Sequence, residues 1–322
     1  MALVGEFPAD FRAPVFIVLH IPPDSPTLLP QILSRRALLP VSGAVHGEKW
    51  KAGHIYIATP DHHLLLEADG TMRTVRGPRE NRHRPAVDPL FRSAALVSGP
   101  NAIGVILSGN LDDGTAGLLA IKQRGGVAIV QDPNDALYPD MPLSALHNVP
   151  VDYKLPLSAI AAQIVESVNA PPRKRPRENG PAFGRMQLET RMAEMDSDAM
   201  EEDDRPGKPS AFSCPDCGGV LWEIEDDEFV RYRCRVGHAF SPETMLGAQD
   251  DVLEEALWTA LKTLEESARL SDRLALTERG RGHEWMARRF DEKADEARTR
   301  AEAIRRFLVT QRESPSARGE QA

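Results

Sequence analysis

Residues 103–130 read IGVILSGNLDDGTAGLLAIKQRGGVAIV, and they are the most informative part of the sequence about the fold class. It begins with the apolar run IGVIL and ends with the run GVAIV, both short and rich in Val and Ile. Between them lies a helical pattern from Thr115 to Arg124. Short apolar runs of this kind are typical of strands buried on both faces of a parallel sheet. The stretch therefore predicts a strand, a helix and a second strand.

The same alternation extends toward the N-terminus. Residues 14–19 (PVFIVL) and 54–58 (HIYIA) are further strand-like runs, and residues 27–38 have a helical pattern. Strands that alternate with helices indicate a doubly wound α/β fold with a mostly parallel sheet. The stretch 54–75 also contains short strands turned at Asp69-Gly70, which predicts an antiparallel hairpin attached to that sheet.

Composition narrows the class of protein. The chain has 322 residues, of which 41% are hydrophobic and 27% charged, with a formal net charge of −9. That balance favours neither nucleic acid nor an anionic membrane as a partner. No apolar run approaches the roughly 20 residues that span a bilayer, and MALVGEFPADF is not typical of a signal peptide. We expect a cytoplasmic protein.

The second half of the chain has a different organisation. Residues 171–210 combine the basic stretch PPRKRPR with the acidic stretch EMDSDAMEEDD, which predicts a disordered linker rather than a nucleic-acid patch. The expected parts are an α/β domain over 1–170, this linker, a cysteine-bearing module over 211–243, helices over 244–312 and a disordered tail over 313–322.

Two apolar stripes run along the helical region. Gly280 and Gly282 separate them, so the region predicts two helices. Folding back as a hairpin would bury both stripes, and so would pairing with another chain as a homo-oligomer. A spacer or oligomerisation element is the simplest interpretation. The stripes consist of Leu253, Leu257, Leu261 and Leu264, and of Met286, Phe290, Ala297, Ala301, Ile304 and Leu308.

The three cysteines form a metal-ligand pattern with one histidine. Cys214 and Cys217 make a CxxC pair, and Cys234 and His238 follow after a hairpin-like segment. This spacing is typical of a zinc ribbon, and a complete set of four ligands favours a structural zinc over a catalytic one. Because the intervening hairpin is acidic, we expect a protein partner rather than a nucleic acid for this module.

Two candidate catalytic residues follow predicted strands. His20 comes directly after PVFIVL, and Asp113 lies in the loop after IGVIL. Chemistry in open α/β sheets gathers at the carboxyl ends of the strands, which is where both residues fall. Taken singly, each has an ordinary structural explanation, a buried histidine and a helix cap.

Together these residues belong to a recognisable set of motifs. The segments VFIVLHIPPDSPTLLPQIL, GHIYIATPDHHLLLE, HRPAVDPLFRSAA, GVILSGNLDDGTAGL and VQDPNDALYPDMPLSAL resemble, in this order, the catalytic domain of CheB-type protein-glutamate methylesterases. The resemblance implies a Ser-His-Asp triad that removes methyl esters from chemoreceptor glutamates and releases methanol, without a catalytic cofactor. It places His20 and Asp113 in that triad, and methylated chemoreceptor-type proteins become the expected partners.

The resemblance also assigns a loop to the oxyanion environment. This chain has Ser108-Gly109-Asn110-Leu111 where the family usually has Thr-Gly-Met-Gly. Gly109 and Asn110 are therefore the candidate oxyanion residues, because an Asn side chain can donate a hydrogen bond to an oxyanion.

The nucleophilic serine of the family is not found at its place. The family keeps it in a Gly-rich turn after the first strand, and the 19 residues before His20 contain no serine. Ser25, which we expect to cap a helix before Pro26, and Ser108 are poor substitutes. Without that strand we expect a gap at the centre of the sheet. Either the true start lies further upstream, or the chain is a decayed esterase that serves as a non-catalytic adaptor.

Overall fold

The computed structural model describes the chain except for residues 1, 172–177, 179, 202–204, 227–228 and 312–322. The chain divides into two compact units, residues 1–246 and 247–322. Most of the expected basic stretch at 171–177 and the whole expected tail at 313–322 lie outside the described residues.

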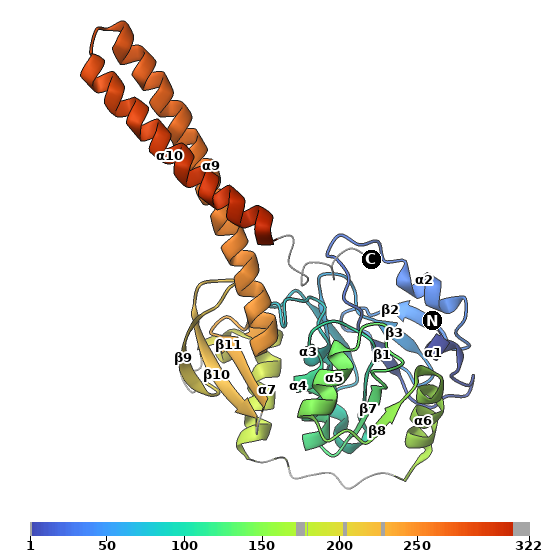
Figure 1. The fold of residues 1–322 in the computed structure, drawn as a ribbon. Helices are drawn as coiled ribbons and strands as arrows, with labels where there is room; N and C mark the ends of the chain where they lie inside the picture. The colour runs from blue at the N-terminus through green and yellow to red at the C-terminus, as the bar shows by residue number, and fades with distance from the viewer. Residues whose placement is uncertain (1, 172–177, 179, 202–204, 227–228, 312–322) are drawn as a thin grey trace. The chain divides into compact units, whose positions relative to one another are not determined.

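Two three-stranded parallel sheets form the centre of the first unit (Figure 1). Their strand orders are β1-β3-β2 and β6-β7-β8, and every pairing within them is parallel. Four of these strands, β1, β3, β6 and β7, lie in the apolar runs that predict strands, whereas β2 and β8 were not expected. The strands are β1 (Val15–Ile17), β2 (Val41–Gly43), β3 (Ile55–Ile57), β6 (Ile103–Ile106), β7 (Val127–Gln131) and β8 (Tyr153–Leu155).

Helices cover both faces of these strands. In β3, Ile55 and Ile57 enter one core while Tyr56 enters the other, because successive side chains of a strand point to opposite faces. The first core is completed by α1 (Ala2–Gly5), α2 (Leu29–Ser34) and α6 (Leu157–Asn169). The second is completed by α3 (Val87–Ser98), α4 (Thr115–Gln123) and α5 (Asp140–Asn148). The predicted doubly wound α/β architecture is therefore confirmed.

The two parallel sheets are not joined to each other by strand pairing among the described residues. β1 and β6 are end strands, so each has one edge without a neighbouring strand there. Both cores nevertheless continue across the interruption, since β1 and β6 contribute side chains to the same clusters. A missing central strand would leave an interruption of this kind.

The antiparallel hairpin forms where the sequence predicts it. β4 (His63–Leu66) pairs with β5 (Met72–Val75), and the turn contains Asp69 and Gly70, whose φ is +84°. The hairpin is a separate two-stranded sheet rather than an extension of the parallel sheet. It packs against α3, where the Ser93 hydroxyl accepts a hydrogen bond from the Leu66 amide.

Two local expectations are wrong. The helix predicted over 27–38 is shorter, and Ser25 does not cap it, because a second proline, Pro30, occupies the first turn and Leu28 the cap position. The predicted disordered linker over 171–210 contains α7 (Pro181–Ala193), α8 (Ser197–Glu201) and the first half of β9 (Lys208–Ser213). Charge and proline content predicted disorder there, but α7 buries one side of its surface against α3.

The cysteine-bearing segment is an antiparallel sheet of the order β12-β11-β10-β9. The other strands are β10 (Val220–Asp226), β11 (Phe229–Cys234) and β12 (Ala239–Phe240). This sheet belongs to the same compact unit as the α/β domain. An isolated bridge between Glu80 and Ala239 joins the two directly.

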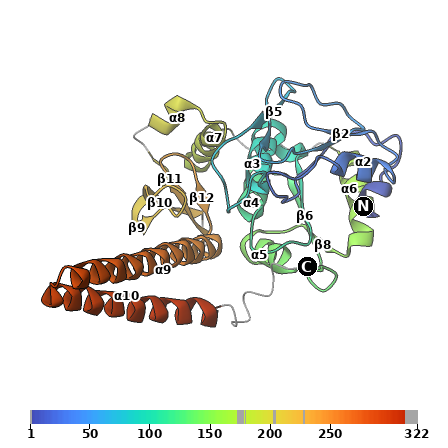
Figure 2. The same ribbon diagram turned by 90° about the horizontal axis from the view of Figure 1, so that it is seen from above.

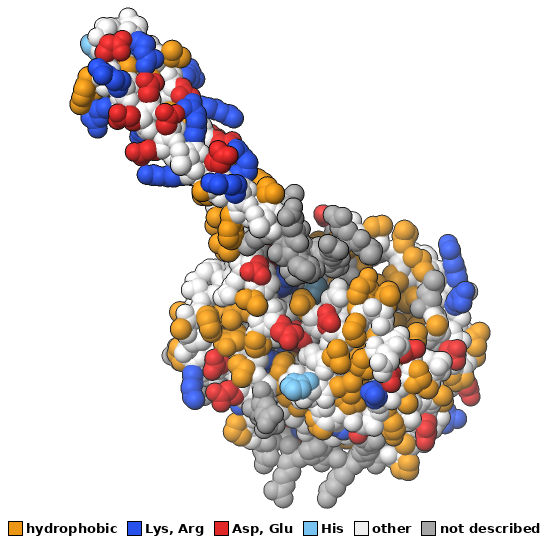
Figure 3. All heavy atoms as spheres, in the orientation of Figure 1, with side chains coloured by type: hydrophobic (Ala, Val, Ile, Leu, Met, Phe, Trp, Pro, Cys, Tyr) orange, Lys and Arg blue, Asp and Glu red, His pale blue; other side chains and the backbone are white. Residues whose placement is uncertain are grey.

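The second unit consists of most of α9 (Pro242–Gly280) and all of α10 (Glu284–Gln311). The helices lie side by side in both views (Figures 1 and 2) and pack through Leu261, Ala301 and Leu308. Leu253 and Met286 from the predicted stripes are instead exposed. Both signs of charge are interspersed over the outer surface (Figure 3). No helix in the described part of the chain is long and apolar enough to cross a membrane.

Candidate active site and metal-ligand cluster

The structure brings the predicted catalytic pair together. His20 follows β1 and Asp113 follows β6, so both lie at the carboxyl ends of parallel strands. His20 Nε2 lies 2.7 Å from Asp113 Oδ2. The Asp113 side chain is 1% exposed and the His20 side chain 22%. The other ring nitrogen of His20, Nδ1, therefore faces away from the carboxylate.

The Asp113 carboxylate receives further hydrogen bonds at the start of α3. The Val87 amide donates to Oδ2 at 2.6 Å, and the Asp88 amide donates to Oδ1 at 3.3 Å. Asn81 Nδ2 also donates to Oδ1, at 3.1 Å. Burial alone would raise the pKa of Asp113, but the hydrogen bond and charge of His20, with the Val87 amide, hold it well below its usual range. Asp113 is therefore a stable negative partner for an imidazolium.

A second histidine lies against the first. The His83 and His20 rings are parallel within 5° and their centroids lie 3.8 Å apart. Burial, followed by the charge of His20, lowers the pKa of His83 to about 4. His83 is therefore neutral at neutral pH, and it can hold the plane of the His20 ring without adding a competing positive charge.

Two buried carboxyl groups flank Asp113. Burial and then the charge of Asp113 raise the pKa of Asp88 to about 7, although Asp88 accepts hydrogen bonds from the Gly117 amide and from Asn81. Burial also raises the pKa of Asp112 to about 7, against a hydrogen bond from Ser241. The cluster thus favours negative charge on Asp113 over its two neighbours.

The loop that presents Asp113 depends on left-handed backbone. Leu111 has φ +60° and Gly114 has φ +93°. A Cβ on Gly114 would lie 2.5 Å from Ile106 Cδ1 and 2.8 Å from Val87 Cγ1. Both the conformation and the space at position 114 therefore require glycine.

The two candidate oxyanion residues differ in what they can offer. The Gly109 amide already donates to the Tyr138 carbonyl at 3.0 Å, so the expectation that Gly109 supplies an oxyanion donor is wrong for this conformation. The Asn110 side chain is exposed, and no hydrogen bond of it is found within the described ranges. Asn110 therefore remains the candidate hydrogen-bond donor to the oxyanion in this loop.

Neither candidate serine contacts His20 through a hydrogen bond in the described part of the chain. The Ser108 hydroxyl accepts a hydrogen bond from the Tyr138 amide at 2.8 Å and so holds the loop closed. Ser25 lies between β1 and α2. No hydrogen bond joins any serine to His20 in the part of the chain that the structure describes.

Sequence reasoning missed the residues that support the pair. His83 and Asp88 lie in the motif HRPAVDPLFR, which carried the resemblance but did not show which side chains contact His20 and Asp113. No sequence pattern indicated a role for Asn81. Arg84 and Arg92 lie in the same motif: Arg84 pairs with Asp61, and Arg92 is buried against Glu80.

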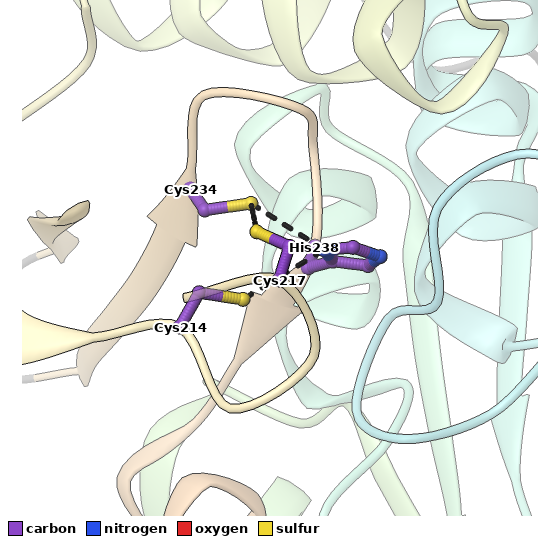
Figure 4. Close-up of side chains that lie close together, drawn as sticks. All are labelled: Cys214, Cys217, Cys234 and His238. Atoms are coloured by element: carbon purple, nitrogen blue, oxygen red, sulfur yellow. Dashed lines mark hydrogen bonds between the residues drawn. The ribbon is translucent and has the colours of Figure 1, made fainter. Parts of the chain in front are cut away.

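The four predicted metal ligands converge in the antiparallel sheet (Figure 4). The ligand atoms of Cys214, Cys217, Cys234 and His238 lie within 4.8 Å of one another. His238 Nδ1 is 3.7 Å from Cys214 Sγ and 3.5 Å from Cys234 Sγ, and Cys217 Sγ is 3.7 Å from Cys234 Sγ. A tetrahedral zinc would separate two sulfurs by about 3.8 Å and a sulfur and a nitrogen by about 3.6 Å. The residues fit the ion.

The chain matches known proteins over its first half. The sequence model of the family described as CheB methylesterase matches residues 1–164. A Leptospira interrogans protein, provisionally named protein-glutamate methylesterase/protein-glutamine glutaminase, is 42% identical over 159 residues, which cover 49% of this chain and 82% of that protein. A Trichodesmium erythraeum protein named protein-glutamate methylesterase/protein-glutamine glutaminase is 36% identical over 169 residues, which cover 52% of this chain and 48% of that protein.

A solved structure agrees with these sequence matches. The crystal structure of the Thermotoga maritima CheB methylesterase catalytic domain superposes with a TM-score of 0.50 and 34% sequence identity. The superposition covers 51% of this chain and 89% of that domain. The family match ends before α7, the cysteine-bearing sheet and the C-terminal helices begin.

Proposed function

The chain belongs to the CheB methylesterase family, and from this membership we propose that it is a hydrolase of protein-glutamate methyl esters. The proposed substrates are methylated glutamate side chains of chemoreceptor-type proteins, in the cytoplasm, during chemotaxis or related signalling. The observation that carries the proposal is the 2.7 Å contact between His20 Nε2 and the buried Asp113 Oδ2.

This pair suits the activation of a hydroxyl nucleophile. His20 Nδ1 takes the proton of the hydroxyl while its oxygen bonds to the ester carbonyl carbon. The imidazolium then gives that proton to the methoxy oxygen, and methanol leaves. Water attacks the acyl-enzyme by the same route and releases a glutamate carboxylate. Asp113 stays ionised throughout and stabilises the charged ring, and we propose that the Asn110 side-chain amide donates a hydrogen bond to the oxyanion.

The names of the relatives also include a glutaminase activity. The same attack on a glutamine side chain would release ammonia in place of methanol. A substrate panel for this chain therefore includes a glutamine-bearing receptor segment beside the methylated one.

The proposal requires a hydroxyl at His20 Nδ1. We propose that this hydroxyl belongs to a serine in a turn that precedes the present Met1, as the family resemblance implies, and that this turn lies next to the interruption between β1 and β6. The first measurement is therefore the intact mass and the N-terminal peptide of the protein purified from its own cell. A mass above 35.5 kDa, together with a serine in the added N-terminal peptide, would identify the third residue of the triad.

We expect His20→Ala in that native-length protein to lower kcat/KM for a methylated receptor segment by a factor on the order of a thousand or more. The reason is that the alanine variant has no group to accept the hydroxyl proton. Methanol release, followed over time, measures the effect.

The matched control is His147→Ala, which removes an exposed histidine of α5. It should leave methanol release unchanged. A native protein that begins at Met1 and hydrolyses neither substrate would refute the esterase function.

We also propose that Cys214, Cys217, Cys234 and His238 bind one structural zinc ion. Four protein ligands leave no coordination position open, which is typical of structural rather than catalytic sites. Asp216 Oδ2 lies 3.8 Å from His238 Nε2, on the side of the ring opposite the ligand nitrogen, where a carboxylate helps to orient a ligating imidazole. In this proposal the ion forms no bond to the substrate and takes no part in breaking the ester.

The alternative function is a non-catalytic adaptor. It would bind protein partners through the metal-bearing sheet and the helical pair, including a second copy of the chain. The observation that favours it is the set of large apolar side chains that the helices leave exposed, among them Leu253, Trp258 and Trp285. The mass and hydrolysis measurements above separate the two functions.

A further inference from the structure

The turn between the second pair of predicted metal ligands packs against the α/β domain. Cys234 and His238 bracket this turn, in which the Gly237 amide donates to the Cys234 carbonyl. A Cβ on Gly237 would lie 2.7 Å from Pro78 Cγ, so the contact leaves no room for a side chain. Immediately after His238, the Ala239 amide donates to the Arg79 carbonyl at 3.2 Å. The Ala239 carbonyl accepts from the Asn81 amide at 2.8 Å. The backbone beside the metal site is therefore hydrogen-bonded to residues 79–81.

A buried ion cluster fixes the same contact. Glu80 accepts hydrogen bonds from Arg92 of α3, at 2.6 and 2.9 Å, and from Arg233 of β11, at 3.1 Å. Arg233 also reaches Glu189 of α7 at 3.2 Å, and Glu189 accepts two further bonds from Arg231. The Glu80, Arg92, Glu189 and Arg233 side chains are at most 3% exposed. Arg233 directly precedes the ligand Cys234. The metal site therefore fixes the position of the Arg233 guanidinium, one of the two that neutralise Glu80.

Asn81 connects this contact to the catalytic pair. Its Oδ1 accepts from the Ser241 amide at 3.3 Å and from the Thr244 hydroxyl at 3.4 Å. Its Nδ2 donates to Asp113 Oδ1 at 3.1 Å and to Asp88 Oδ2 at 2.8 Å. One end of the amide is therefore held by the residues that follow the metal site, and the other end holds the Asp113 carboxylate.

The loop around Asn81 needs outside support to keep its shape. Asn81 has φ +49° and Arg82 has φ +70°, two consecutive left-handed residues without a glycine. Such backbone persists where the surroundings over-determine it. The surroundings here include Ala239, Ser241 and Thr244, and the loop continues directly to His83, which stacks on His20.

We propose that the segment from Cys214 to Thr244, with its metal bound, is a built-in clamp on the esterase domain. In this clamp Asn81 is a positioning residue that acts through Asp113. Release of the metal frees Arg233 and Ala239, the 79–83 loop loses its partners, and the Asp113 carboxylate loses its Asn81 donor and its fixed orientation toward His20. The catalytic consequence rests on the function proposed above, whereas the clamp itself does not.

The experiment compares the full chain in four forms: zinc-bound, chelated, Arg233→Met and Arg235→Met. Arg233→Met keeps the aliphatic stem and removes the charge that neutralises Glu80. Arg235→Met is the matched control, because Arg235 lies on the other side of Cys234 and is exposed. Hydrogen exchange is measured at the amides of Asn81 and Val87, with the amides of β7 as the reference for a folded core. The imidazole proton shared by His20 and Asp113 is followed by NMR.

We expect chelation and Arg233→Met each to accelerate exchange at Asn81 and Val87 by about tenfold or more, and to remove the shared proton signal, while β7 stays protected. Zinc should restore the chelated protein, and Arg235→Met should behave like the zinc-bound chain. Asn81→Ala should lose the shared proton with zinc still bound.

Two results would overturn the clamp: a chain that holds no zinc, or unchanged exchange and an unchanged proton signal after zinc has been removed. Exchange that responds to zinc in a native-length protein without methanol release would uphold the clamp and refute the esterase function. If the esterase is active, kcat/KM should fall in parallel with the proton signal.

Discussion

Among single residues, Asp112 is expected to make the free energy of unfolding depend on pH. Its carboxyl is buried, Oδ1 has no hydrogen-bond partner within the described chain, and burial raises its pKa to about 7 from an ordinary value of 3.8. A carboxyl whose folded pKa is raised contributes stability that is complete below about pH 4 and is lost as the pH rises through about 7. Between these limits we expect the free energy of unfolding of the wild type to fall, relative to Asp112→Asn, by on the order of a few kcal/mol. Urea unfolding at stepped pH measures this difference.

The control for this prediction is Asp10→Asn, which changes an exposed carboxyl in the same unit. Its difference from the wild type should stay nearly constant over the same pH range. A constant difference for Asp112→Asn as well would show that Asp112 is ionised in the fold.

Among the elements, Gly114 at the start of α4 controls the conformation of the loop that presents Asp113. Its φ of +93° and the short distance to the Ile106 side chain both oppose a Cβ. We expect Gly114→Ala to lower the free energy of unfolding by about 2–4 kcal/mol, the sum of backbone strain and overpacking. Chemical denaturation measures the loss.

Gly70 provides the comparison: its φ is +84°, but among the described residues no atom other than those of its chain neighbours lies within 4 Å of the position that a Cβ would take. Gly70→Ala should therefore cost only the backbone strain, about 1 kcal/mol. Equal losses for the two variants would mean that packing around Gly114 relaxes without cost.

At the scale of the whole molecule, the two compact units should respond differently to metal. The proposed zinc ligands lie in the first unit, and the second is held together by its own apolar contacts and ion pairs, such as Arg279–Asp291. We expect one zinc per chain, and we expect chelation to lower the unfolding temperature of the first unit by about 10 °C, because metal binding contributes directly to folding. Elemental analysis and calorimetry measure both quantities.

The helical unit should keep its own transition after chelation. Leu261→Ala is the reciprocal control, because Leu261 is buried between α9 and α10 and the variant should lower only the helical transition. If chelation lowered both transitions together, the two units would not be independent.

The amino-acid sequence was sufficient to predict the elements whose signals are local. Apolar runs of five or six residues predicted β1, β3, β6 and β7, and Asp69-Gly70 predicted the turn of the hairpin. The spacing of three cysteines and one histidine predicted the four metal ligands. The order of the motifs predicted the pairing of His20 with Asp113. These features depend on residues close together in the chain or on motifs carried by short segments.

The roles of the charged and polar residues between these motifs became visible only in the folded chain. The predicted linker contains Glu189, which we expected to be solvent-exposed. In the structure it is buried and hydrogen-bonded to Arg231 and Arg233. Glu80 and Arg233 are 153 positions apart, and Asn81 and Ser241 are 160 apart. The physical reason is that a charge or an amide can be buried only where its partners are also present, and no local pattern records a partner from a distant segment.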